Sequence, residues 1–92
     1  MYSKWFDCEK IKDTPVVMTR HTGGYIMLDK HRKKALRRFM IDEKIPADKR
    51  EQVALLADGD HIMWIIGWRI SNYYKIGPDT KRVLQVKIKN GG

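Results

Sequence analysis

Two apolar runs separated by a short polar turn constrain the fold of this 92-residue chain more than any other feature. The first run is Leu55-Leu56-Ala57, the second is Ile62-Met63-Trp64-Ile65-Ile66, and Asp58-Gly59-Asp60 lies between them. The Asp-Gly pair favours a tight hairpin, and consecutive apolar residues predict at least one strand that is buried on both faces. A chain of this length builds one hydrophobic core, so we expect residues 1–92 to form a single domain.

Three further strands are expected, two before the hairpin and one after it. Residues 15–20 are predicted as one strand and residues 25–28 as the next, with a turn at Thr22-Gly23-Gly24 between them. Residues 82–89 are predicted as the last strand, with a charged outer side, and residues 90–92 are expected to fray.

Two helices are expected in the middle of the chain. Asp29 is a suitable N-cap for a helix over residues 30–41, which contain mostly good helix formers and neither glycine nor proline. Pro46 ends or closely follows this helix, and residues 47–53 are compatible with a second, shorter one. About five mainly antiparallel strands packed with two helices favour an α+β fold over a repeated βαβ arrangement.

The positive charge of the chain is clustered. Nineteen Lys and Arg against eleven Asp and Glu give a net charge of +8. Residues 31–44 carry six basic and two acidic side chains and residues 61–92 carry six and one, whereas residues 45–60 carry two and four. Such clustering is typical of a surface that binds an anionic partner, such as nucleic acid, a heparin-like polymer or an acidic membrane.

In the expected helix, five cations lie at positions i, i+3, i+4, i+7 and i+8, namely Lys30, Lys33, Lys34, Arg37 and Arg38. This spacing predicts one continuous basic face opposite an apolar stripe, and such a face would contact successive phosphates. The alternative is a basic face that is only solvated.

Four aromatic side chains in and after the second apolar run would suit the stacking of nucleic-acid bases. They are Trp64, Trp68, Tyr73 and Tyr74. Because Trp64 and Trp68 occur in an apolar segment with period two, we expect them on one buried sheet face instead. Arg69 is expected either to extend a basic surface or to pair with a turn carboxylate, Asp58 or Asp60.

No arrangement of side chains indicates catalysis or a metal centre. Cys8, His21, His31 and His61 are too far apart in the sequence to supply a ligand pair on one element. No nucleophile and base form a recognisable local set, which argues against an independent hydrolase. His21 and His31 are expected at the rim of the basic region, where a nearby anion would favour their protonation.

The compartment follows from cysteine usage and hydropathy. A lone cysteine cannot form an internal disulfide, which favours a reducing cytoplasm. No window approaches the roughly 20 apolar residues of a membrane span, and the first residues lack the apolar stretch of a signal peptide. We therefore expect a cytoplasmic protein with no membrane partner.

Several segments occur in an order that is specific to one family. They are Lys33-Lys34-Ala35-Leu36-Arg37-Arg38-Phe39-Met40-Ile41-Asp42-Glu43-Lys44-Ile45-Pro46, then Arg50, Leu55-Leu56-Ala57-Asp58-Gly59, Trp64-Ile65-Ile66-Gly67-Trp68-Arg69-Ile70-Ser71, Lys75 and Thr80-Lys81-Arg82-Val83-Leu84. Over about residues 15–88 the chain resembles the C-terminal domain of bacterial tRNA(Ile)-lysidine synthetase. It departs from the family at Thr22-Gly23-Gly24, where a Pro-Gly-Asp type turn is usual, at Ala54 in place of a common proline, and at Asn72 in place of a common glutamate.

This resemblance implies a part of an ATP-dependent, magnesium-requiring ligase that joins lysine to the wobble cytidine of an isoleucine tRNA. That chemistry belongs to an N-terminal domain with a Ser-Gly-Gly-x-Asp-Ser loop, which does not occur in this sequence. We therefore expect this chain not to be an enzyme by itself and to hold no cofactor. It is expected to be the tRNA-binding C-terminal domain, either excised or a natural fragment, with the parent's catalytic domain as a further partner.

The resemblance and the charge pattern together predict binding of the A-form acceptor stem through phosphates and groove shape. The expected tRNA-binding residues are Lys33, Lys34, Arg37, Arg38, Arg20, Lys44, Arg69 and Lys75. The alternative is a structural or dimerisation module, including a homodimer, with a merely solvated basic face.

Overall fold

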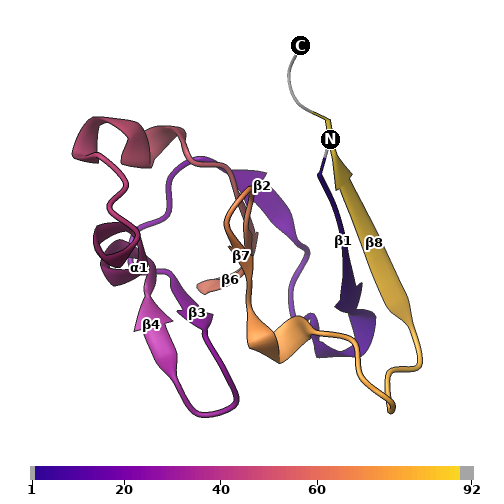
Figure 1. The fold of residues 1–92 in the computed structure, drawn as a ribbon. Helices are drawn as coiled ribbons and strands as arrows, with labels where there is room; N and C mark the ends of the chain where they lie inside the picture. The colour runs from indigo at the N-terminus through magenta and orange to yellow at the C-terminus, as the bar shows by residue number, and fades with distance from the viewer. Residues whose placement is uncertain (1, 90–92) are drawn as a thin grey trace.

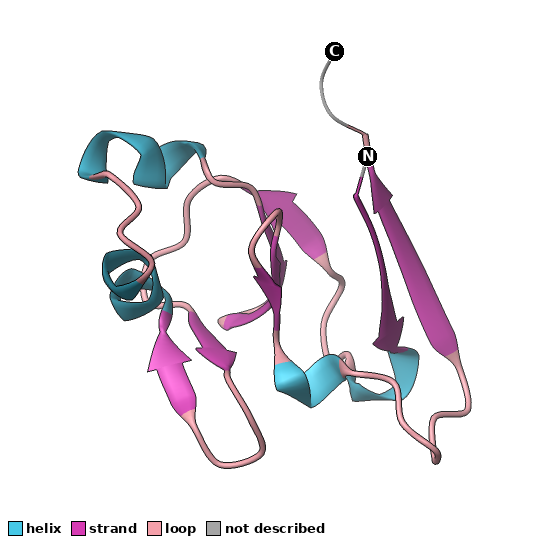
Figure 2. Ribbon diagram, viewed as in Figure 1, coloured by secondary structure: helices cyan, strands magenta, loops and turns pink. Residues whose placement is uncertain are grey.

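The computed structural model describes residues 2–89 and contains two sheets (Figures 1 and 2). The larger sheet has the strand order β2-β5-β6-β3-β4, with β7 also paired to β6. Its strands are β2 (Val16–Met18), β3 (Tyr25–Met27), β4 (Lys33–Ala35), β5 (Leu55–Asp58), β6 (His61–Ile65) and β7 (Arg69–Ile70). The second sheet is a two-stranded ribbon of β1 (Tyr2–Asp7) and β8 (Val83–Ile88). The helices are α1 (Leu36–Asp42) and three 3-10 helices, η1 (Cys8–Lys10), η2 (Ala47–Gln52) and η3 (Asn72–Tyr74).

The predicted α+β class is confirmed, since helices accompany the sheets and all strand pairs but one within residues 2–89 are antiparallel. The exception is β3 beside β6, which pair in parallel through Tyr25 and His61. Helix α1 overlaps the second half of the helix that was expected over residues 30–41. Helix η2 lies where the shorter helix over residues 47–53 was expected. No helix among residues 2–89 is long and apolar enough to cross a membrane.

The predicted hairpin is present and consists of β5 and β6. All residues of β5 and β6 are buried. Gly59 takes the positive φ of 63° that the tight turn between them requires. Leu56 pairs with Trp64 and Ala57 with Ile62, so Met63 is an extra residue in β6. This bulge turns Met63 and Trp64 toward the same face of the sheet.

The larger sheet separates two hydrophobic clusters. On one face, the cluster under α1 contains Ile26, Leu36, Phe39, Met40, Leu55, Ile62 and Ile65. On the other face, the cluster under the β1–β8 ribbon contains Phe6, Leu56, Met63, Trp64, Ile66 and Tyr74. In Figure 1, α1 lies on the left above β3 and β4, the strands β2, β6 and β7 lie in the middle, and the ribbon lies on the right.

The predicted helix over residues 30–41 is wrong in its first half. Asp29 Oδ1 accepts hydrogen bonds from the amides of His31 (2.8 Å) and Arg32 (2.9 Å), so it stabilises a turn and not a helix N-terminus. Residues Lys33–Ala35 then form β4, which pairs antiparallel with β3, and the helix begins at Leu36. The predicted five-cation helical face therefore does not exist, because Lys30, Lys33 and Lys34 precede the helix.

The buried position predicted for Trp68 is also wrong. Trp64 is 1% exposed, as expected, but Trp68 is 49% exposed. Gly67 has a φ of 87° and reverses the chain between β6 and β7, and the Trp68 amide donates to the Ile65 carbonyl at 2.8 Å. The indole thus lies at the tip of a tight turn instead of on the sheet face.

The first strand, β1, was not predicted. It pairs with β8 along its whole length, from Tyr2 with Ile88 to Asp7 with Val83. The predicted strand 82–89 is confirmed as β8, and the expected fraying of residues 90–92 lies outside the described residues.

Candidate nucleic-acid interface

An open groove of about 720 Å³ lies between the turn at residues 19–24, the start of α1 and helix η2. Leu36, Met40 and Leu55 supply apolar surface to it. Arg20, Arg37 and Arg50 also line it, each from a different one of the three segments. The fold therefore brings three guanidinium groups around one concave surface, although they are up to thirty residues apart in the sequence.

A backbone hydrogen bond holds the turn at residues 19–24 against α1. The amide of Leu36, at the start of α1, donates to the Gly24 carbonyl at 2.8 Å. Gly23 has a φ of 80°, and a Cβ on Gly24 would lie 2.9 Å from Ile62 Cδ1 and 3.0 Å from His21 Nδ1. Glycine is required at both positions for different reasons, a left-handed backbone at the first and close packing at the second.

The three arginines of the groove differ in their partners. Arg20 forms an exposed ion pair with Glu51 at 2.6 Å, and Arg50 donates through Nε to the Ile45 carbonyl at 2.9 Å. Arg37 is exposed and has no ion pair with any carboxylate of residues 2–89. One glutamate against three arginines leaves the groove net positive, and the Arg37 guanidinium has neither an ion pair nor a side-chain hydrogen bond within residues 2–89.

His21 lies at the edge of the groove, as its predicted rim position suggests. Its side chain is only 10% exposed, and Nε2 lies 2.8 Å from the Gly59 carbonyl. A neutral ring that donates through Nε2 keeps an acceptor at Nδ1, and this buried atom has no hydrogen-bond partner within residues 2–89. His31, in contrast, lies in the exposed turn before β4.

Residues 16–88 match the family described as the TilS substrate C-terminal domain. The chain belongs to this family. Among curated TilS relatives, the tRNA(Ile)-lysidine synthase of Caldanaerobacter subterraneus subsp. tengcongensis is 39% identical over 87 residues, which are 94% of this chain. The tRNA(Ile)-lysidine synthase of Clostridium tetani is 36% identical over 90 residues, or 97% of this chain. The chain spans only 19% of the length of each of these two relatives.

A solved structure agrees with the assignment to TilS. The crystal structure of a TilS C-terminal domain superposes with a TM-score of 0.67 at 26% sequence identity. The superposition covers 88% of this chain and 66% of the other. The recognised resemblance to the C-terminal domain of lysidine synthetases is thereby confirmed.

Of the eight residues expected to bind tRNA, this TilS domain places only Arg20 and Arg37 in the groove. Lys34 and Arg38 both pair with Asp42, at 2.5 and 3.1 Å, and the hydrogen bond from Lys34 lowers the pKa of Asp42 most. The two cations share one carboxylate, so this cluster retains a net positive charge.

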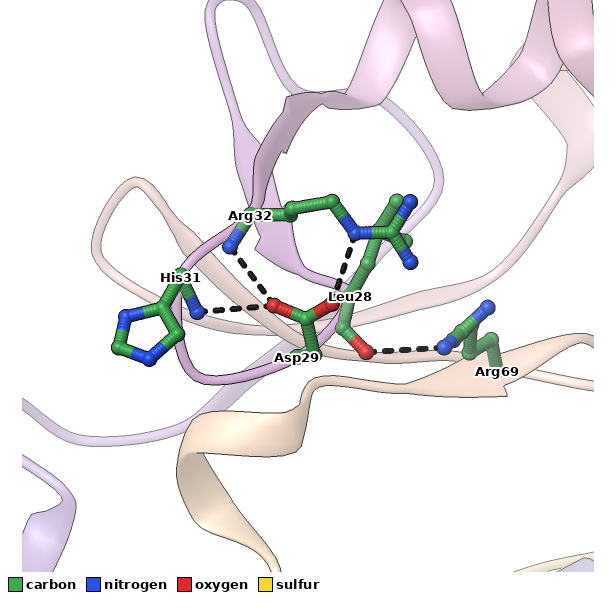
Figure 3. A network of polar contacts seen from close by, with 5 residues as sticks. All are labelled: Leu28, Asp29, His31, Arg32 and Arg69. Carbon is green, nitrogen blue, oxygen red and sulfur yellow. Dashed lines mark hydrogen bonds and ion pairs between the residues drawn. The ribbon is translucent and has the colours of Figure 1, made fainter.

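The other expected residues are dispersed. Lys33 Nζ lies 4.1 Å from the centroid of the Tyr25 ring, and Lys44 has a φ of 57° just after α1. Arg69 pairs with neither turn carboxylate and instead donates to the Leu28 carbonyl at 2.9 Å (Figure 3). Lys75 is exposed just after η3.

Figure 3 also shows how Asp29 organises the turn beside Arg69. The His31 amide, together with the Arg32 guanidinium at 2.7 Å, holds the pKa of Asp29 below its usual value. Arg32 thus pairs locally with Asp29.

Arg50 is a groove residue that sequence reasoning did not select. It occurs in the family signature, but an arginine in an acidic stretch gives no sign of a basic site. Only the packing of η2 beside α1 brings it to the same groove as Arg37.

A buried polar cluster lies on the other face of the sheet, near η3. His61 stacks between Tyr25 and Tyr73, with ring centroids at 4.6 and 5.3 Å, and its Nε2 lies 2.7 Å from Ser71 Oγ. Burial lowers the pKa of His61 to about 4, so the ring is neutral at pH 7.

Asp58 connects this cluster to the N-terminal segment. Burial opposes its charge, but hydrogen bonds from Tyr74 Oη at 2.6 Å and from the amides of Lys12 and Asp13 hold its pKa below the usual value. The cluster is internally satisfied and serves the fold. Among residues 2–89 no three His, Cys, Asp or Glu side chains lie close enough to hold a metal ion.

Proposed function

We propose that this chain is the part of a tRNA(Ile)-lysidine synthase that holds the acceptor stem of the isoleucine tRNA. In this proposal residues 1–92 act as one tRNA-binding domain in the cytoplasm. The remainder of the synthase, which includes the catalytic domain, uses ATP and magnesium to join lysine to the wobble cytidine. The chain itself contributes binding and orientation, which are able to supply several kcal/mol of an enzyme's rate acceleration.

The observation that supports the proposal most is the meeting of Arg20, Arg37 and Arg50 at one groove. An A-form stem presents phosphates and 2′-hydroxyls in a regular array, and proteins read it mainly by shape and by these groups. Guanidinium groups make bidentate contacts with phosphate oxygens. Of the three, only Arg20 pairs with a carboxylate of residues 2–89, so Arg37 and Arg50 keep their charges unneutralised.

In this proposal the two cations at Asp42, Lys34 of β4 and Arg38 of α1, add to the positive surface. Lys34 and Arg38 hold one carboxylate between them, and Arg37 lies next to Arg38 on the helix. In this proposal Lys33, Lys44, Arg69 and Lys75 add positive potential around the stem without converging on the groove. Electrostatic attraction of this kind accelerates encounter and weakens as salt increases.

The test is a titration of tRNA(Ile) into the chain at several salt concentrations. Arg37→Ala and Arg50→Ala are each expected to weaken binding and to lower the slope of log K against log salt by about one, since each loses one phosphate contact. Lys87→Ala is the matched control, because Lys87 lies on β8 on the face of the ribbon that points away from the sheet. Folded groove variants with unchanged affinity and slope would refute the proposal.

A structural or dimerisation role is the second candidate. It is favoured by exposed apolar side chains on the outer face of the ribbon, where Trp5 is 48% and Val83 is 50% exposed. Sedimentation of the isolated chain distinguishes the two candidates. A dimer that is indifferent to tRNA would support the second one.

A further inference from the structure

A second, smaller cleft of about 350 Å³ lies on the ribbon side of the sheet, away from the arginine groove. Tyr2 and Lys4 of β1 form one wall, and Trp68 and Arg69 of the β6–β7 turn form the other. Trp64, which is 1% exposed, also lines it. This volume is at the lower end of the range for pockets that bind small molecules, which is about 300 to 1,000 Å³.

Two aromatic side chains of the cleft, Trp68 and Tyr2, are exposed. Trp68 is 49% exposed, and its backbone is held by the amide hydrogen bond to Ile65. Tyr2 is 41% exposed and packs edge-on against Trp64, with ring centroids 6.4 Å apart at an interplanar angle of 83°. A Cβ on Gly67 would lie 3.4 Å from Tyr2 Oη, so the turn approaches the strand closely. The cleft thus has an exposed aromatic side chain on each of its two walls.

The charges of the cleft have one sign. Lys4 and Arg69 line it, and no acidic side chain does so among the described residues. Arg69 is oriented by its hydrogen bond to the Leu28 carbonyl, which uses one Nη and leaves other donors free. An exposed indole in one cleft with two cations that pair with no carboxylate of residues 2–89 matches a nucleotide, because the base stacks on the aromatic ring and the phosphate contacts the cations. A purely apolar ligand would make no ionic contact with Lys4 or Arg69.

We propose that this cleft binds one unpaired nucleotide of the RNA, with its base stacked on Trp68 and its phosphate contacted by Lys4 and Arg69. The inference rests on the proposed function and deepens it. Bases inside a duplex do not offer a free face, so the nucleotide must come from a single-stranded segment next to the held stem. The groove then binds duplex through phosphates, and the cleft adds a contact that only an unpaired base makes.

The test compares two RNA probes, a blunt duplex with the acceptor-stem sequence and the same duplex with a short unpaired 3′ tail. The tail is expected to tighten binding by the wild-type chain about tenfold, since stacking of one base on an aromatic side chain supports factors of this size. Trp68→Ala is expected to abolish this gain while it leaves the affinity for the blunt duplex unchanged. Trp68→Phe is expected to restore most of the gain, because the phenyl ring still stacks.

Trp5→Ala is the matched control, because Trp5 is equally exposed but lies on the opposite face of β1 from Tyr2 and Lys4. It is expected to keep the full gain from the tail. A tail of abasic sugar-phosphate that helps as much as the normal tail would overturn the stacking inference. So would an unchanged gain in folded Trp68→Ala, or a change of oligomeric state in that variant, which would assign the cleft to a protein contact. If the blunt duplex itself does not bind, the proposed function fails; if it binds and the tail adds nothing, only this inference fails.

Discussion

Mild acid is expected to destabilise this domain through His61. The side chain is 9% exposed, stacks between Tyr25 and Tyr73 and lies within hydrogen-bond distance of Ser71. Burial lowers its pKa from 6.5 to about 4. Between these two values the unfolded chain binds a proton that the folded chain does not, so stability falls as the pH decreases.

The magnitude follows from this difference. At about 1.4 kcal/mol per pH unit, a pKa lowered from 6.5 to about 4 corresponds to about 3 kcal/mol. Over the two pH units from 6.5 down to the lowest assayed pH of about 4.5, about 2 to 3 kcal/mol of this is expected to be lost. This loss is large beside a total stability of about 5 to 15 kcal/mol for a typical domain.

The assay is urea unfolding of the chain at several pH values from about pH 7.5 down to about pH 4.5, in comparison with His61→Phe. The variant retains an aromatic ring in the stack but cannot bind a proton or contact the Ser71 hydroxyl. It is expected to be less stable than the wild type near neutral pH and to depend less on pH in this window. Parallel pH profiles for the two proteins would refute the assignment of the acid sensitivity to His61.

Two further predictions concern the fold. Asp58→Asn is expected to lower the free energy of unfolding by about 2 kcal/mol, because it removes the charged acceptor of the Tyr74 hydroxyl and of two backbone amides. A thermal melt like that of the wild type would contradict this. Gly24→Ala is expected to cost about 1 to 3 kcal/mol, since its Cβ would lie 2.9 Å from Ile62 Cδ1. Gly77→Ala is the matched control, with no atom within 4 Å of an added Cβ, and equal melting temperatures for the two glycine variants would contradict the packing argument.

The β5–β6 hairpin was predictable because all its determinants are local. Apolar side chains at consecutive positions require burial on both faces, and the turn residues between them accept only a few backbone conformations. The position of Met63 in a bulge was not predictable, because the register depends on how β5 lies beside β6.

The prediction of a helix over residues 30–41 was wrong in its first half for a physical reason. The carboxylate of Asp29 accepts from the next free amides whether these begin a helix or a turn, so the capping signal is ambiguous. Pairing of β4 with β3 decides the outcome, and this pairing is a tertiary interaction that overrides the helix propensity of Lys33 and Lys34. Strand β1 was missed in the same way, because its partner β8 lies at the other end of the sequence.

The type of ligand of the candidate site was predictable from the sequence, but the set of residues that form the groove was not. The clustered positive charge predicts an anion-binding surface, and the family resemblance assigns the anion as tRNA. Which cations converge depends on the packing of η2 and the turn against α1, and this selects Arg50 while it leaves Lys75 elsewhere.

Amide chemical-shift mapping of the isotopically labelled chain during titration with a blunt acceptor-stem duplex tests the central claim most directly. The claim predicts saturable shifts for the turn at residues 22–24, for Arg37 and for Arg50, with Lys87 unchanged. Addition of salt is expected to reverse these shifts, since phosphate contacts release bound counterions. Saturable shifts confined to the β1–β8 ribbon, with none at the groove, would contradict the claim.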